Sequence, residues 1–233
     1  MIKYTFTKFT KWNVLKKLIV QEIDDLIIGS IWIVAFMSFL VGGVVAIQTA
    51  LNIESPFLPG NLIGFATRQS VILEFAPTLI SIIMAGKVGS FITSSIGTMR
   101  VTEQIDALEV MGVNSLNYLI FPKIISLMLY PFLITLAMFL GILGGYIASV
   151  YAGFSTSFDF IQGIQLDFKV FHVIYAYIKT TLFAFILATI PSYHGFFMKG
   201  GALEVGKAST NAVVYSSIFI LFANYILTQL MLI

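Results

Sequence analysis

The stretch LIIGSIWIVAFMSFLVGGVVAIQTAL, Leu26 to Leu51, contains no charged residue. A bilayer core of roughly 30 Å is crossed by about 20 apolar residues in a helix, so this stretch is long enough to span a membrane. The whole chain agrees with it, because 58% of its 233 residues are hydrophobic and only 10% are charged. An ordinary soluble domain has about 25% charged residues. The sequence therefore predicts an all-α integral membrane protein.

Four further apolar stretches follow the first. We predict transmembrane helices over residues 26–51, 62–85, 124–151, 171–194 and 212–233. The first 25 residues differ, because their apolar side chains recur at helical spacing while the lysines lie mostly elsewhere. This pattern predicts an amphipathic helix in the membrane interface over residues 1–25. With no soluble domain and no internal repeat, we interpret residues 1–233 as one domain.

The basic residues predict the orientation in the membrane, because lysine and arginine are enriched in short cytoplasmic loops. Most of them fall on one side of the predicted spans: the N-terminal lysines with Lys87, Arg100, Lys123, Lys199 and Lys207. This distribution places the N-terminus in the cytoplasm. Five spans then place the C-terminus on the opposite side.

The composition and the motifs argue against several functions. A formal net charge of +2 gives no reason to expect a nucleic-acid partner. The segment GALEVGKA, Gly201 to Ala208, has phosphate-loop spacing up to Lys207, but Ala208 stands where the magnesium-binding Ser or Thr belongs. His172 and His194 are far apart, and no metal or nucleophile motif occurs. We expect no enzyme activity and no cofactor in this chain.

A short charged segment interrupts the apolar pattern: GTMRVTEQIDALEVMG, residues 97–112. As a helix ending at Gly112, it places Val101, Ile105 and Leu108 on one face. Its acids lie on a neighbouring face: Glu103, Asp106 and Glu109. The acidic face fits either a partner-binding surface or a solvated loop, and spacing alone leaves both open.

The second predicted span carries an acid, Glu74, with Pro77 three residues later. An ionisable group at membrane depth costs at least roughly 2.5 to 3.5 kcal/mol, so it tends to face a pathway or a partner. Pro77 removes a helical hydrogen bond and favours a bend. We predict that both line a substrate cavity or its gate; the alternative is a structural ion pair of Glu74 with Arg68 or Lys87. Gln48, in the first span, is a candidate for the same cavity or for an interhelical hydrogen bond.

Small residues recur within the spans. Gly141 and Gly145 form a GxxxG pair, and Gly86 and Gly89 lie in the segment AGKVGS. Glycines at this spacing let helices approach closely, so we predict that these four serve helix packing.

The region from Glu74 to Lys123 closely resembles the permease subunits of the MlaE (YrbE) family. The match is dense in three segments: AGKVGS at 85–90, IGTMRVTEQIDALEVMGV at 96–113 and YLIFPK at 118–123. Weaker agreement covers nearly the whole chain. The resemblance implies a homodimeric permease of an ABC transporter in the bacterial inner membrane, which moves phospholipid between inner and outer membranes and so maintains lipid asymmetry.

The resemblance also implies partners and roles. A cytoplasmic MlaF-like ATPase would bind ATP and Mg, a periplasmic MlaD-like protein would carry an MCE domain, and a MlaB-like STAS-domain protein accompanies the ATPase in some systems. The segment 97–112 would be the coupling helix that docks on the ATPase. The residues expected to serve this coupling are Arg100, Thr102, Glu103, Gln104, Asp106 and Glu109.

Some positions depart from the family pattern. Leu73 replaces the usual arginine before Glu74, Lys87 replaces another arginine, and Ser94 and Ser95 replace an Ala-Glu pair. Ser95 is therefore a further candidate for the substrate cavity, whose polarity these changes alter. Two alternatives to phospholipid transport remain: the same architecture carrying another apolar cargo, such as a sterol or hydrophobic toxicant, and a membrane channel or scaffold without an ATPase.

Overall fold

The computed structural model describes residues 1–5, 12–53 and 60–232. Within these residues the chain is almost entirely helical and contains no strand. Five helical stretches in the described part are long and apolar enough to cross a membrane: Trp12–Asn52, Asn61–Val101, Ser115–Tyr151, Val170–Phe197 and Ala202–Leu232. The predicted all-α membrane fold with five spans is confirmed.

The observed helices are longer than the predicted spans. The second predicted span, 62–85, belongs to a helical stretch that continues to Val101, and the fifth, 212–233, begins already at Ala202. Hydropathy marks only the part of a helix that suits the bilayer, whereas the hydrogen-bonded helix continues into polar residues such as Glu204 and Lys207. Residues 6–11 of the predicted interfacial helix, residues 54–59 and Ile233 lie outside the described residues.

The described chain separates into two compact units, each assembled from distant segments. The first comprises Met1–Ser30, Ser81–Tyr130 and Thr181–Ile233, and the second comprises Ile31–Ile80 and Pro131–Thr180. Because the chain passes repeatedly from one unit to the other, neither is a continuous stretch of sequence. The prediction of a single domain stays a prediction.

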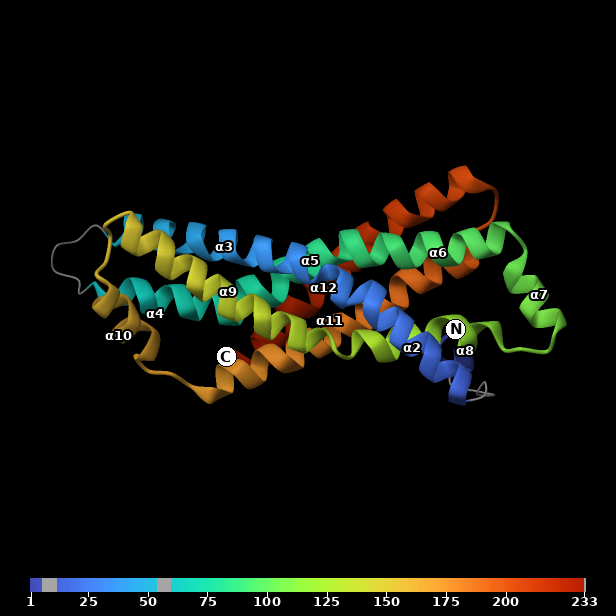
Figure 1. The fold of residues 1–233 in the computed structure, drawn as a ribbon, viewed down its shortest axis with the longest axis horizontal. Helices are drawn as coiled ribbons and strands as arrows, with labels where there is room; N and C mark the ends of the chain where they lie inside the picture. Colours follow the sequence, from blue (N-terminus) through green and yellow to red (C-terminus); the bar gives the residue numbers. More distant parts are fainter. Residues whose placement is uncertain (6–11, 54–59, 233) are drawn as a thin grey trace. The chain divides into compact units, whose positions relative to one another are not determined.

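The first unit contains the N-terminal helices and the last span. Its elements are α1 (Ile2–Thr5), α2 (Trp12–Leu26), η1 (Ile28–Ser30), most of α5 (Ile80–Met84), η3 (Ala85–Gly89), α6 (Ser90–Val101), α7 (Gln104–Val110), α8 (Ser115–Leu127), the end of α11 (Val170–Phe197) and α12 (Ala202–Leu232). Helix α12 packs along α6, and α2 packs along α8 (Figure 1). Two hydrogen bonds fix α2 to α8, in which Lys123 donates to Glu22 and Ser126 donates to the Ile19 carbonyl.

The second unit contains parts of the first four spans. Its elements are α3 (Ile31–Asn52), α4 (Asn61–Ser70), η2 (Val71–Leu79), most of α9 (Tyr130–Tyr151), α10 (Ser157–Gln165) and the start of α11 (Val170–Phe197). Helices α4 and α10 lie side by side (Figure 1), and α3 packs on α4. Phe160 of α10 is fully buried with Ala50 and Ile63, and its ring meets Tyr146 edge-on at 5.7 Å.

Glycines permit close contact between α3 and α9. A Cβ on Gly42 would lie 1.8 Å from the Gly141 carbonyl oxygen, and one on Gly144 would lie 2.1 Å from the Phe39 carbonyl oxygen. A Cβ on Gly145 would lie 2.7 Å from a methyl carbon of Thr67. The two backbones therefore approach in the way that small residues allow in membranes.

Helix α10 was not among the predicted elements. Its N-cap, Thr156, accepts a hydrogen bond from the Asp159 amide at 3.1 Å, and Asp159 lies three residues after the cap as in a capping box. At its other end, Arg68 donates to the Ile164 and Leu166 carbonyls at 2.8 and 3.0 Å. Arg68 is 2% exposed, with its guanidinium beside the rings of Phe65 and Phe168. Its role is thus to hold α10 onto α4.

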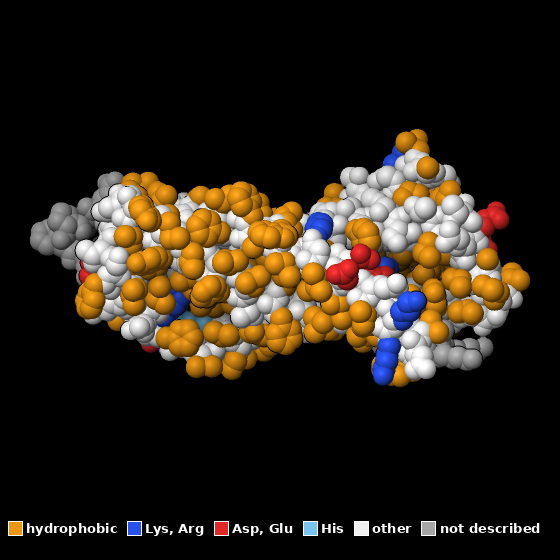
Figure 2. All heavy atoms as spheres, viewed as in Figure 1, with side chains coloured by type: hydrophobic (Ala, Val, Ile, Leu, Met, Phe, Trp, Pro, Cys, Tyr) orange, Lys and Arg blue, Asp and Glu red, His pale blue; other side chains and the backbone are white. Residues whose placement is uncertain are grey.

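Large hydrophobic side chains remain on the surface. On the face that Figure 2 shows, they cover most of the helices and charged side chains are few. The last span is the extreme case, since only 11% of its most apolar window is buried. Such a surface suits lipid or another protein rather than water.

Candidate functional site: a charged helix, an intramembrane ion pair and an apolar groove

The charged segment 97–112 is not the single helix that the sequence predicts. Helix α6 ends at Val101, and Thr102 and Glu103 form a turn before α7 starts at Gln104. Glu103 adopts φ 61°, a left-handed conformation that ends α6 and redirects the chain. Gly112, at φ 75°, supplies the turn after α7. The expected helix between the second and third spans is therefore α7, and it is shorter than predicted.

The three acids of this segment have different surroundings. Asp106 pairs with Arg100 at 2.7 Å, and Glu109 accepts a hydrogen bond from the Ser115 hydroxyl at 2.8 Å. Within the described residues the Glu103 carboxylate makes no ion pair. The predicted acidic face is thus partly occupied by contacts that position α7 itself, and Thr102 likewise bonds back to the Thr98 carbonyl.

The apolar residues of α7 do not all face inward. Ile105 is fully buried and Leu108 is partly buried, but Val101 is exposed, which departs from the predicted packing face. Two apolar side chains at the end of α7 are strongly exposed: Val110 at 90% and Met111 at 68%. An apolar tip beside exposed charges is typical of a surface that another protein covers.

Glu74 lies in η2, a π-helical segment that also contains Pro77. Its carboxylate pairs with Lys179 of α11, whose Nζ lies 2.9 Å from Oε1. The alternative partners expected from the sequence are engaged elsewhere: Arg68 bonds carbonyls near α10, and Lys87 donates to the Gly29 carbonyl and the Ser30 hydroxyl. The Glu74 side chain is still 41% exposed. Its placement at a cavity or gate stays a prediction.

The other candidate residues are more scattered. Gln48 is exposed on α3, and Ser95 is half-buried on α6 in the other unit. A Cβ on Gly89 would make ordinary contact with Pro191 at 3.4 Å, whereas Gly86 has nothing within 4 Å of such an atom. No neighbour within the described chain therefore requires a glycine at position 86.

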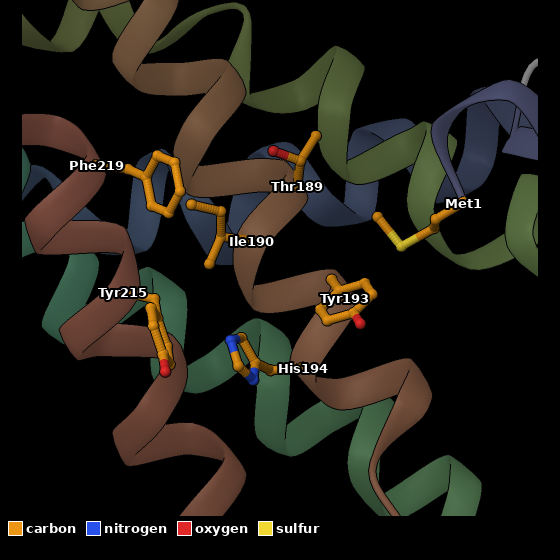
Figure 3. Close-up of a pocket in the computed structure, with 7 residues that line it drawn as sticks. All are labelled: Met1, Thr189, Ile190, Tyr193, His194, Tyr215 and Phe219. Carbon is orange, nitrogen blue, oxygen red and sulfur yellow. The ribbon is translucent and has the colours of Figure 1, made fainter. Parts of the chain in front are cut away.

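A groove of about 780 Å³ lies between α11 and α12 in the first unit. Figure 3 shows the side chains that line it: Met1, Thr189, Ile190, Tyr193, His194, Tyr215 and Phe219. The His194 and Tyr215 rings stack at 5.3 Å, and Ile190 and Phe219 lie one helical turn away from them. The groove thus combines an apolar part with a polar aromatic part.

This groove was not predicted from the sequence. Of its lining residues only His194 was considered from the sequence, as a metal ligand, and it was set aside. The available signal was the polar cluster Tyr193–His194 inside a long apolar helix, since polar groups at membrane depth tend to face a cavity or a partner.

Comparisons with known proteins agree with one another. A family model described as "Permease MlaE" matches residues 19–230. A probable ABC transporter permease protein of Rickettsia bellii is 37% identical over 214 residues, covering 91% of this chain and 82% of that protein. One from Synechocystis sp. is 37% identical over 172 residues, covering 72% and 65%. The chloroplastic Protein TRIGALACTOSYLDIACYLGLYCEROL 1 of Arabidopsis thaliana is 33% identical over 166 residues, covering 67% and 45%.

Proposed function

The chain belongs to the MlaE family of ABC transporter permeases, and we propose that it moves phospholipid between the inner and outer membranes of a bacterium. The observation that best supports a phospholipid cargo is the groove between α11 and α12. Its volume of about 780 Å³ falls in the range of ligand pockets, roughly 300–1,000 Å³. Apolar walls suit an acyl chain, and the stacked His194 and Tyr215 offer hydrogen-bonding groups to a lipid headgroup.

The name of one relative supports a glycerolipid cargo. The Arabidopsis protein is named after trigalactosyldiacylglycerol, which is a galactose-bearing glycerolipid. Members of such a family would share the requirement to hold two acyl chains, with the headgroup varying. Maintenance of lipid asymmetry is the cellular role that follows for a phospholipid cargo.

A separate ATPase drives the cycle in this proposal, as the name ABC transporter permease implies. We assign its docking surface to α7, the short helix between the second and third spans. The exposed Val110 and Met111 would fill a pocket on the ATPase, while Glu103 and its neighbours would meet basic groups around that pocket. ATP and Mg would be bound by that MlaF-like subunit, on the cytoplasmic side together with the N-terminus.

Two copies of this chain form the permease in this proposal. The support is the poorly buried last span, since only 11% of its most apolar window is buried against the rest of the chain. The C-terminus would then lie in the periplasm, where a MlaD-like MCE protein receives the lipid. A MlaB-like STAS-domain subunit would bind on the ATPase side.

The experiment is native mass spectrometry of the complex, purified from its own membranes through a tag on this chain. We expect two copies of the chain, an ATPase and bound phospholipid. Phe219→Trp should reduce the bound lipid by filling the groove, whereas the control Phe222→Trp, on the same helix but outside the groove, should not. A sterol or other apolar compound in place of phospholipid would favour the other cargo, and absence of an ATPase would favour a channel or scaffold.

A further inference from the structure

Lys179 is a fully buried lysine in the fourth span. A charged side chain at membrane depth is expensive unless partners satisfy it. Its ammonium group has three N–H bonds, and the structure provides two hydrogen-bond acceptors and the face of an aromatic ring. Nζ lies 2.9 Å from the Leu73 carbonyl oxygen, 2.9 Å from Glu74 Oε1 and 4.9 Å from the centre of the Tyr175 ring. All three of these contacts of Lys179 lie within its own unit.

The Leu73 carbonyl lies four residues before Pro77 in the second span. In an α-helix this carbonyl would pair with position 77, where proline has no amide hydrogen, and in a π-helix it pairs with the amide of Thr78. The chain widens here into the π-helical segment η2, Val71–Leu79. The Lys179 ammonium reaches across from α11 and donates to this carbonyl. A backbone carbonyl in the turn that contains Pro77 is thus bonded to a donor from another span.

The same ammonium also fixes Glu74. Oε1 of the carboxylate pairs with Lys179, and Oε2 accepts a hydrogen bond from the Thr78 hydroxyl at 3.2 Å. Because both oxygens are held, the carboxylate has a defined direction even though its side chain is 41% exposed. The ion pair also joins η2 to α11, so that the second and fourth spans are linked at the proline.

We propose that Lys179 is a positioning residue of the transport cycle: it caps the carbonyl at the Pro77 bend, holds the Glu74 carboxylate and locks the second span to the fourth. The second span continues to Val101, and two residues, Thr102 and Glu103, separate it from α7. A movement imposed on α7 then reaches the bend through one helical stretch, and the Lys179 contacts pass it to the fourth span. This role rests on the proposed function of α7 and of the groove.

The test uses hydrogen–deuterium exchange of residues 71–79 together with ATP-driven transfer of phospholipid by the purified complex. Lys179→Met should speed exchange in this segment and abolish most transfer. Lys179→Arg keeps a cation with several donors and should retain both properties. Lys169→Met is the matched control, because that lysine of the same unit is exposed, and it should change neither.

A charge swap separates the two contacts of Lys179. The double variant Glu74→Lys, Lys179→Glu can form an ion pair in reverse, but a carboxylate at position 179 cannot donate to the Leu73 carbonyl. We expect the swap to leave exchange fast and transfer low. If the swap restores both, the carbonyl contact plays no part and the proposal is overturned.

A further variant covers the case in which Lys179→Met does not fold. The double variant Glu74→Leu, Lys179→Met removes both charges, which removes the unpaired charge that a single change leaves behind. We expect it to insert and assemble but to transfer little lipid. Normal transfer by this variant, or unchanged exchange in Lys179→Met, would overturn the proposal. Exchange does not depend on the cargo, so a wild-type complex that moves no phospholipid would refute the proposed function alone.

Discussion

At the scale of single residues, Gly42 decides how closely α3 and α9 can approach. A Cβ at this position would lie 1.8 Å from the Gly141 carbonyl oxygen, and a backbone atom cannot move aside as a flexible side chain can. Overpacking a well-packed interior costs typically about 1–3 kcal/mol. The contact between the two helices therefore depends on the absence of a side chain.

We predict that Gly42→Ala lowers the thermal stability of the purified protein in detergent and reduces its yield from membranes. Gly206→Ala is the control, because nothing lies within 4 Å of a Cβ there. In a helix interior alanine is about 0.5–1 kcal/mol better than glycine, so this control should be neutral or slightly stabilising. Equal unfolding temperatures for Gly42→Ala and the wild type would contradict the close contact.

The partner of Glu74 shows a limit of sequence reasoning at the same scale. The sequence identified Glu74 as an acid at membrane depth and Pro77 as a bend, and the structure places both in η2. The partner of Glu74 could not be identified from the sequence, because Lys179 lies 105 residues away and no local spacing connects the two residues. The nearer cations, Arg68 and Lys87, were reasonable expectations that three-dimensional packing assigns to backbone carbonyls instead.

At the scale of elements, α10 depends on Arg68. This side chain donates to two carbonyls at the C-terminal end of α10, where a helix has no donors of its own. Losing the partner of a buried polar group costs roughly 1–3 kcal/mol for each group left unsatisfied. The planar guanidinium reaches both carbonyls at once, which the single ammonium of a lysine does less well.

We predict that Arg68→Met makes the α10 amides exchange faster with deuterium, and that Arg68→Lys has a smaller effect in the same direction. Lys169→Met should have none, since its pair with Asp167 is 3.4 Å long and both side chains are more than half exposed. Mass spectrometry of peptides covering residues 157–166 measures this. Exchange that is equally slow in Arg68→Met would show that core contacts of Phe160 hold α10 without the arginine.

The second prediction for an element concerns the acids of α7 and ATPase docking. Exposed ion pairs contribute roughly 0.2–1 kcal/mol each, so single changes at Glu103, Asp106 or Glu109 should weaken ATPase docking only mildly. Reversing all three to lysine replaces attraction with repulsion and should abolish docking. Co-purification of the ATPase at matched membrane expression measures the effect.

The matched control for α7 is a neutral triple variant: Glu103→Gln, Asp106→Asn and Glu109→Gln. It keeps oxygen acceptors for Arg100 and Ser115, so α7 should stay in place and retain part of the ATPase. Undiminished recovery of the ATPase with the triple lysine variant would exclude the acids as part of the docking surface. The exposed Val110 and Met111 would then carry the contact alone.

Elements were predictable to the extent that the membrane determines them. The number and order of the spans follow from hydropathy, because a span needs about 20 apolar residues whatever its neighbours are. Their bounds do not, since a helix continues as far as its backbone bonds and caps allow. The break between α6 and α7 depends on the left-handed conformation of Glu103. This conformation is uncommon for a glutamate, so the sequence does not predict it.

At the scale of the whole molecule, α7 and the groove between α11 and α12 are suited to two different functions, ATPase docking and cargo binding. In the proposed function, the exposed apolar tip and charges of α7 would bind the ATPase, and the apolar walls of the groove between α11 and α12 would hold a lipid. The groove could not be predicted, because its residues come from two spans whose facing sides are set by packing. The family itself could be predicted, because the segment 96–113 is distinctive in sequence.

The most direct test of the account is ATP-driven transfer of a fluorescent phospholipid by the purified complex in liposomes. We predict transfer that requires ATP, is strongly reduced by Phe219→Trp in the groove and is unchanged by Phe222→Trp beside it. ATP hydrolysis without phospholipid movement, or equal transfer by both tryptophan variants, would contradict the claim that this permease carries phospholipid through that groove.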